Sequence, residues 1–196
     1  MGYGVAGQPY RVRSQLVHHI EEIEARITRF DARLLAGLAG AQNALALLQT
    51  LPGVDLIGAA MLLVEIGTDM TAFSSADRLV SWAGVCPGNN KSAGKRKSGH
   101  VRKGNLTVRR LLCEFAHAAS RTQSVFKSKP QALVVRHGHK RSIVAIAHKL
   151  LRTIFFMLKR GEHYRDAATD YEALSVQRNA PRWIKALTHF GFLASA

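Results

Sequence analysis

The chain has 196 residues, with 28 Lys and Arg against 13 Asp and Glu, and a formal net charge of +15. Hydrophobic residues make up 47% of it, enough to bury a core, so the composition excludes a wholly disordered chain. No apolar run has transmembrane length, the first eight residues lack the apolar core of a secretory signal, and two cysteines support neither a disulfide framework nor a Cys-based zinc site. We therefore expect a cytoplasmic protein that has polyanionic partners and no membrane contact.

The positive charge is concentrated in the middle of the chain. Residues 78–161 hold 19 of the 28 Lys and Arg but a single acidic residue, Glu114. Clustering of this kind is the footprint of phosphate neutralisation, and a basic surface kept for solubility would not need it. We therefore expect a nucleic acid as the partner.

The first predicted element is a helix over residues 11–48, preceded by a disordered N-terminus over residues 1–10. Its apolar residues follow a 4-3-4-3-4 spacing that is typical of the a and d positions of a heptad repeat: Leu16, Ile20, Ile23, Ile27, Phe30 and Leu34. This stripe predicts a coiled coil through which the chain forms a homo-oligomer, with an ordinary amphipathic helix on the core as the alternative. Gly37 and Gly40 weaken the helix near its end.

The next predicted element is a helix-hairpin-helix. The pattern breaks at Leu51–Val54, and a strongly apolar segment, Leu56–Ile66, follows at once. The turn contains Gly53, and the backbone N–H groups at the start of the second helix are suited to hold a phosphate. Asp55 would cap that helix, but its carboxylate would repel a phosphate, so a purely structural hairpin is an equal alternative.

Further helices are predicted downstream. Ser75 and Asp77 suit a helix start before residues 78–83, and Asn105 suits the cap of a helix that begins at Leu106. Apolar spacing predicts a helix over residues 142–158 and short helices over 164–174 and 182–190. No segment alternates as a strand would, so the predicted fold class is mainly α.

Residues 84–105 are interpreted as a long, basic, glycine-rich loop. Glycines let the backbone approach a phosphate, cations neutralise it, and Ser92 and Ser98 supply hydroxyls. The candidate nucleic-acid-binding residues are Gly53, Lys91, Lys95, Arg96, Lys97, Arg102, Lys103 and Asn105, with Arg109 and Arg110 on the following helix. A serine nucleophile needs a base, a metal or an electropositive setting, so the loop by itself leaves hydrogen bonding as the simpler role of its serines.

Two other residue types were considered as sites. His137, His139 and His148 raise a metal site as an alternative, but neighbouring acids and cysteines are lacking, so we predict no metal site and expect phosphate contact or surface exposure. Trp82 and Trp183 lie in apolar helical patterns and are expected in the core.

A series of ordered motifs runs from about residue 51 to residue 166. It comprises Leu51–Val54, Phe73–Pro87, Ser92-x-Gly94, Gly99-x-Val101-x-Lys103-Gly104-Asn105, Leu111-Leu112, Ala118-Ala119, His137–Leu151 and Tyr164–Asp166. This series resembles the C-terminal half of an insertion-sequence transposase of the IS one-ten family, whose members are bridge-RNA-guided DNA recombinases. The resemblance implies a transposase C-terminal domain over residues 49–166 and a C-terminal helical extension over residues 167–196.

The resemblance also implies a catalytic serine. By its position five residues after the Gly84-x-x-Pro87 motif, that serine corresponds to Ser92, and Ser98 ranks second. In the family the serine attacks a DNA phosphodiester and forms a covalent serine–DNA link, which another strand later resolves. The lysines and arginines of the loop would then bind the backbone and stabilise the charge of the transition state.

Family members further carry an N-terminal RuvC-like domain, whose acidic tetrad binds Mg²⁺, and a coiled-coil linker. This sequence begins at the coiled coil, so we expect no cofactor in this chain, Mg²⁺ in the missing RuvC-like domain, and no strand cleavage by the chain alone. The predicted function is DNA transposition through Ser92, with DNA and guide-RNA backbone binding. The alternatives are a non-catalytic nucleic-acid-binding remnant of a truncated transposase and a helix-hairpin-helix protein of DNA repair.

Overall fold

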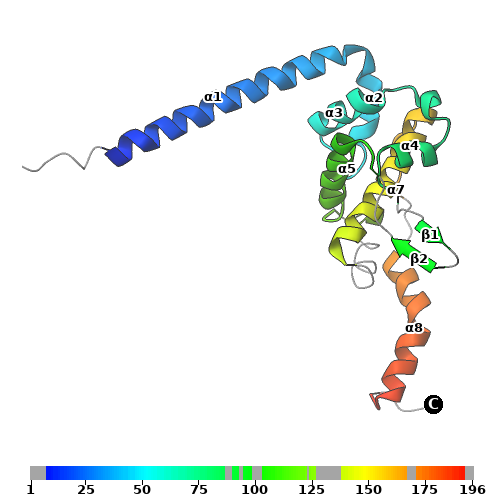
Figure 1. Cartoon of the computed structure of the whole chain (residues 1–196). Coiled ribbons are helices and arrows are strands. Elements are labelled where there is room, and N and C mark those ends of the chain that lie inside the picture. The colour runs from blue at the N-terminus through cyan, green and yellow to red at the C-terminus, as the bar shows by residue number, and fades with distance from the viewer. Residues whose placement is uncertain are drawn as a thin grey trace, which may run out of the picture.

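The computed structural model describes residues 8–86, 90–92, 95–98, 103–122, 124–126, 138–166 and 171–192. Within these ranges it contains seven α-helices, two short 3-10 helices and one two-stranded antiparallel sheet. Helix α1 (Gln8–Gly37) extends far from a helical body, and helix α8 (Tyr171–His189) leaves that body in another direction (Figure 1). The predicted mainly helical fold class is confirmed.

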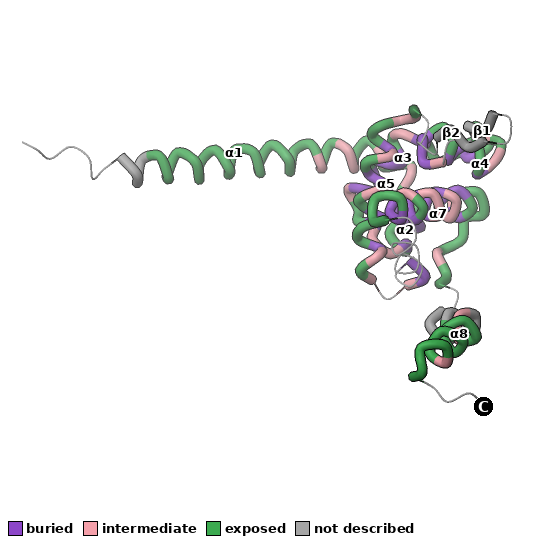
Figure 2. Tube along the Cα trace, turned by 60° about the horizontal axis from the view of Figure 1, so that its bottom comes forward, coloured by how far each residue is buried: buried purple, intermediate pink, exposed green. Residues whose placement is uncertain are grey.

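The helical body is built around α7 (His139–Arg160). This helix packs against α2 (Gln42–Gln49), α4 (Ala76–Trp82) and α5 (Leu106–Ala119), and α3 (Leu56–Ile66) packs against α2 and α5. Buried apolar residues recur every three or four positions along α7 and form its inward face: Ile143, Ile146, Ala147, Leu150, Leu151, Ile154 and Phe155. Burying each large aliphatic side chain contributes about 1.5–3 kcal/mol. The buried residues gather in this body (Figure 2).

Helix α1 is a single helix of 30 residues that ends at Gly37. The single helix predicted over residues 11–48 is therefore wrong. A 3-10 turn over Ala39–Ala41 separates α1 from α2, in the region where Gly37 and Gly40 were expected only to weaken the helix. Leu34, Leu35 and Leu38 pack against the core of the body, whereas residues 12–30 are all exposed. The structure contains one copy of the chain, so pairing of α1 with another copy stays a prediction.

Three helices begin at the residues whose side chains suit an N-cap. The capping pairs are Asp55 with Gly58 N at 3.2 Å, Ser75 with Arg78 N at 3.3 Å, and Asn105 with Val108 N at 3.0 Å. In each pair a side-chain oxygen accepts from one of the N–H groups that a helix leaves unpaired at its start. The starts of α3, α4 and α5 are therefore fixed by local sequence.

Two further parts of the sequence interpretation are wrong. The segment read as a continuous loop contains strand β1 (Asn90–Ser92) paired with strand β2 (Lys95–Ser98), and neither strand has an apolar side chain that could reveal it. Near the C-terminus two short helices were expected, but residues 162–166 are not helical and α8 is one continuous helix that includes Pro181.

Several large apolar side chains are exposed. Trp82 and Trp183, which were expected in the core, are 39% and 49% exposed. Trp82 instead contacts Phe73, with 5.4 Å between the ring centroids. Despite these exposed side chains, none of the helices in the described ranges is long and apolar enough to cross a membrane.

Candidate nucleic-acid interface

Two glycines, Gly84 and Gly104, lie against each other at the two ends of the basic, glycine-rich segment. Asn105 N donates to Trp82 O at 3.1 Å, which brings residue 104 against residue 84. A Cβ atom on Gly104 would lie 2.4 Å from Gly84 N and 2.6 Å from Gly84 Cα, closer than a side chain can approach a backbone. Gly84 itself has a φ of +70°, which glycine adopts without strain. The segment therefore leaves and re-enters the body at one narrow point, which we call the glycine crossing.

Asn105 fixes the chain immediately after the glycine crossing. Its Oδ1 accepts from Val108 N and caps α5, while its Nδ2 donates to Glu65 Oε2 on α3 at 2.7 Å. The predicted cap is confirmed. Both polar ends of the amide have partners within the protein, and nucleic-acid binding by Asn105 stays a prediction. Sequence reasoning missed Glu65, although a single acid within an otherwise apolar helix is a signal that points to a specific partner.

Strands β1 and β2 lie between the two sides of the glycine crossing. The Cα partners are Lys91 with Arg96 and Ser92 with Lys95, and an irregularity next to Lys91 pairs Asn90 with Ser98. The candidate serine and four candidate cations, Lys91, Lys95, Arg96 and Lys97, thus belong to one antiparallel pair that contains no acid. We call residues 90–92 and 95–98 the cationic strand pair.

Other candidate cations lie at the start of α5. Lys103 is exposed just before the glycine crossing, Arg110 is exposed, and Arg109 is half-buried. Neighbouring residues of a helix point in different directions, so Arg109 and Arg110 do not share one narrow face. Arg102 lies outside the described residues. The candidate cations within the described ranges are thus divided between the cationic strand pair and the first turns of α5.

The thiol of Cys113 lies close to Arg109, one of these cations. Burial raises the pKa of Cys113, and the positive charge of Arg109 opposes that shift without cancelling it, while Glu114 adds to it. Because the thiolate is the reactive form of cysteine, this raised pKa lowers the reactivity of Cys113 at neutral pH.

Gly53 has a packing role in the turn between α2 and α3. It has a φ of +83°, and a Cβ there would meet Ala119 N at 2.5 Å and Phe115 O at 2.7 Å. The turn therefore packs against the end of α5 at a distance that only glycine permits. Asp55 also occupies one N–H group at the start of α3. Phosphate binding by Gly53 and a nucleic-acid-binding helix-hairpin-helix stay predictions.

A second cationic surface lies along α7. A cleft of about 380 Å³ is lined in part by Phe126, Lys149, Phe156, Arg160 and Tyr164. The Lys149 ammonium lies 5.4 Å from the centroid of the Phe126 ring, and the Arg160 guanidinium lies 5.4 Å from that of Phe156. Sequence reasoning assigned no binding role to these residues. The contact of Lys149 with Phe126 forms only when α7 packs against a distant segment, whereas Arg160 and Phe156 are four residues apart on α7 itself.

The histidines that raised a metal site do not form one within the described ranges, where no group of three or more His, Cys, Asp or Glu side chains is placed to hold a metal ion. His139 is exposed and its ring stacks on His117, with 5.2 Å between centroids. Burial lowers the pKa of His148, Arg152 lowers it further, and Asp77 acts in the opposite direction. His137 lies outside the described residues.

Residues 45–131 match the model of a known family, described as the transposase IS116/IS110/IS902 family. The matched range runs from α2 to beyond α5 and includes both the glycine crossing and the cationic strand pair. This part of the chain is therefore similar to the transposases of that family, in agreement with the resemblance found in the sequence motifs.

Curated relatives agree with the family match. The chain is 29% identical to a protein of Sinorhizobium fredii described as a transposase, over 84% of this chain and 41% of that protein. It is 30% identical to the transposase for insertion sequence element IS1111A of Coxiella burnetii, over 84% and 46% respectively. It is 32% identical to the 43.6 kDa protein of insertion element IS110 of Streptomyces coelicolor, over 60% and 29%. The matched part of the chain spans less than half the length of these relatives.

Proposed function

We propose that this chain acts in DNA transposition as the part of a recombinase that carries a serine nucleophile. The observation that carries the proposal is the register of the cationic strand pair, in which Ser92 lies directly opposite Lys95 and next to the pair Lys91 and Arg96. Residues directly opposite each other in an antiparallel pair share one face, with Cβ atoms about 4.5–5.5 Å apart. The register therefore brings the backbone of the candidate serine opposite that of a cationic residue.

In the proposed reaction, Ser92 Oγ attacks the phosphorus of a DNA phosphodiester. The Oγ–P bond forms while the P–O bond to one deoxyribose breaks; the serine gives up its hydroxyl proton, and the departing oxygen takes up a proton. Lys95, the residue opposite Ser92, offsets the negative charge that builds on the non-bridging oxygens. The phosphodiester is exchanged, so a hydroxyl of another strand can displace the serine and rejoin the backbone without ATP.

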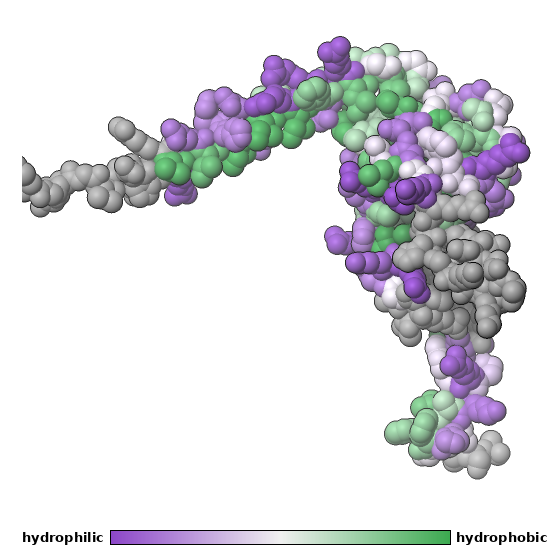
Figure 3. Space-filling view, viewed as in Figure 1, coloured by the Kyte–Doolittle hydropathy of each residue, from purple (hydrophilic) through white to green (hydrophobic). Residues whose placement is uncertain are grey.

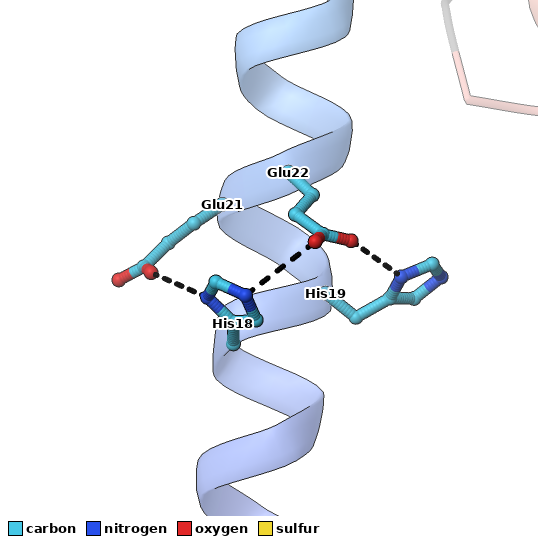
Figure 4. Close-up of polar contacts among 4 residues, drawn as sticks. All are labelled: His18, His19, Glu21 and Glu22. Atoms are coloured by element: carbon cyan, nitrogen blue, oxygen red, sulfur yellow. Dashed lines mark ion pairs between the residues drawn. The ribbon is translucent and has the colours of Figure 1, made fainter.

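The Mg²⁺ of a RuvC-like domain has no ligand set among the described residues. Two adjacent glutamates of α1 are paired with histidines (Figure 4). Glu21 lies 3.8 Å from His18, and Glu22 lies 3.4 Å from His18 and 3.7 Å from His19. All four side chains are at least half exposed, which leaves them well hydrated. We assign no Mg²⁺ to this helix, and no step of the proposed reaction passes through a metal.

We also propose that the candidate cations contact the sugar–phosphate backbone of DNA and of a guide RNA. Backbone contacts position a nucleic acid without reading its sequence.

Covalent trapping tests the proposed reaction. The purified chain is incubated with Mg²⁺, guide RNA and terminus DNA, with and without a separately supplied RuvC-like domain, and protein–DNA adducts are resolved under denaturing conditions. We expect an adduct that disappears in Ser92→Ala and persists in the matched variant Ser98→Ala. An adduct lost only in Ser98→Ala would move the nucleophile to that residue, and an adduct that survives both changes would remove the serine mechanism.

A second candidate function is nucleic-acid binding without catalysis. This function needs only the cations of the cationic strand pair and of the first turns of α5, and no nucleophile. Salt-dependent binding to DNA with no adduct in any of the trapping reactions, including those with the RuvC-like domain supplied, is its expected result.

A further inference from the structure

The cleft along α7 has no part in the proposed reaction. Its volume of about 380 Å³ falls within the range of small-ligand sites in proteins, about 300–1,000 Å³. Three separate segments line it: residues 125–126, residues of α7 between 149 and 160, and residues 162–165, which follow that helix. We call it the α7 cleft.

The wall formed by residues 162–165 is held by two hydrogen bonds to distant parts of the chain. Tyr164 N donates to Oγ1 of Thr50, 114 residues away at the end of α2, at 2.9 Å. Val125 N donates to Oδ2 of Asp166 at 3.1 Å, which joins this wall to the segment that carries Phe126. A wall fixed in this way does not have to be ordered when a ligand binds, which lowers the cost of binding.

Aromatic rings and cations lie against one another in the α7 cleft. The ring centroids of Phe126 and Tyr164 are 6.0 Å apart, and the Lys149 ammonium lies 5.4 Å from the centroid of Phe126. The Arg160 guanidinium lies 5.4 Å from the centroid of Phe156. Phe126 is buried, whereas Phe156 is 39% exposed, so the second ring is accessible to a ligand that enters from solvent.

The lining of the α7 cleft is also net positive. Its charged residues are three cations and one acid: Lys149, Arg160, Arg165 and Glu162. Arg160 and Arg165 are exposed, which places positive charge where a ligand would enter. The electrostatics therefore favour an anion.

This composition differs from that of the exposed apolar surface along α1. There hydrophobic side chains gather in a continuous band, which suits an apolar partner (Figure 3). The α7 cleft instead offers aromatic rings beside positive charge. Proteins hold single-stranded nucleic acid with this combination, because bases stack on rings or guanidinium planes while the phosphates lie beside cations.

We propose that the α7 cleft binds an unpaired nucleotide of a single-stranded nucleic acid, with its base against Phe156 and its phosphate beside Arg160. The bases of an intact duplex are stacked on one another and do not offer their faces to a side chain, so the cleft takes only an unpaired one. This inference rests on the proposed function only in taking a nucleic acid as the ligand, and it involves neither Ser92 nor the cationic strand pair.

An abasic strand separates base contacts from backbone contacts. The full chain is titrated, with fluorescence anisotropy as the readout, into a labelled thymidine oligonucleotide and into an abasic strand of equal length, which keeps the phosphates. We expect wild type to bind the thymidine strand at least about fivefold more tightly, because a stacked base contributes that much or more. Phe156→Leu is expected to abolish this preference and Phe156→Trp, which restores a ring, to keep it. Equal binding of both strands by wild type, or an unchanged preference in Phe156→Leu, overturns the proposal.

The charge is tested with two neighbouring cations of α7. Arg160→Gln removes a cation that lines the cleft, whereas the matched control Lys159→Gln removes one that lies 5.8 Å from the centroid of Phe155, outside the lining. We expect Arg160→Gln to weaken binding of the thymidine strand and Lys159→Gln to leave it nearly unchanged. Equal losses would show attraction by net charge alone and overturn the proposal. Circular dichroism verifies that each variant keeps its helices.

Two further measurements identify the source of the nucleotide and the place of the contact. Thymidine monophosphate is expected to compete poorly with the strand; competition at equal concentration would make the ligand a free nucleotide and overturn the proposal. In the triple variant Lys95→Gln, Arg96→Gln and Lys97→Gln, the preference for the thymidine strand is expected to persist, and its loss would move the base contact to the cationic strand pair. None of these measurements depends on a covalent adduct, so a failure of the serine mechanism and a failure of this proposal are separate results.

Discussion

Asn105 and Glu65 are joined by a hydrogen bond of 2.7 Å between Nδ2 and Oε2, although 40 residues separate them along the chain. The same Asn105 side chain caps α5 through Oδ1. One amide thus links the start of α5 to α3 at the point where the chain returns from the cationic strand pair. The position of that segment relative to the body therefore depends on this contact.

Substitution of Asn105 separates its two roles. Asn105→Ala loses the cap and the partner of Glu65, and we expect a loss of about 1–3 kcal/mol in the free energy of unfolding, measured with urea. Asn105→Asp keeps a capping oxygen but places a carboxylate against Glu65, so a substantial loss is still expected. Adding Glu65→Gln to Asn105→Asp supplies an amide donor and should recover stability; without recovery, the Glu65 contact is unimportant.

The glycine crossing predicts a steric cost. Gly104→Ala forces a methyl group within 2.4 Å of Gly84 N, and we expect it to lower the free energy of unfolding by about 1–3 kcal/mol or more. Gly37→Ala is the matched control, because a Cβ there meets nothing within 4 Å, and helix propensity predicts a change of at most about 1 kcal/mol, toward stability. Similar thermal midpoints for the two variants would contradict the close approach.

His148 predicts a pH dependence of stability. Burial and Arg152 lower its pKa below the ordinary value of 6.5, and only Asp77, which is ion-paired with Arg152, opposes them. The unfolded state therefore binds a proton at higher pH than the folded state, so this contribution to stability is present above about pH 6.5 and is lost as the pH falls through the folded pKa. His148→Gln should flatten the fall in urea stability between about pH 7.5 and pH 5. An unchanged slope would contradict the prediction.

The cationic strand pair predicts the salt dependence of nucleic-acid binding. Each phosphate contact adds about 0.9 to the slope of log K against log salt for duplex DNA. The triple variant Lys95→Gln, Arg96→Gln and Lys97→Gln is therefore expected to reduce that slope by up to about 3, measured by fluorescence anisotropy. The control, Arg182→Gln with Lys185→Gln, removes two exposed charges from α8 and should leave the slope unchanged. An equal reduction in both variants would show that net charge alone governs binding.

Local sequence was sufficient to predict the helix starts and most of the helical body. Asp55, Ser75 and Asn105 cap the helices they precede, because the capping interaction spans only three residues. The apolar spacing of α5 and α7 likewise placed those helices within a few residues of their observed ends. These features depend on residues close in sequence and are therefore accessible to pattern reasoning.

Contacts between distant residues were not accessible in this way. Glycine at position 53 suggested a phosphate-binding turn, but the pattern carries no information about the end of α5 that packs against it. The strand pairing of Ser92 with Lys95 was missed because strand patterns rely on apolar alternation, which these residues lack. Glu65 was missed because its partner lies on another element.

The narrowness of the glycine crossing has an evolutionary consequence. Among the described residues, the two ends of the segment that holds the cationic strand pair meet at Gly84 and Gly104 and at the hydrogen bond from Asn105 to Trp82, while the core lies in the helices. We therefore expect insertions or exchanges beyond the crossing to leave the core packing unchanged. The cationic strand pair can diversify, or be transplanted between related domains, under selection that acts separately from selection on folding.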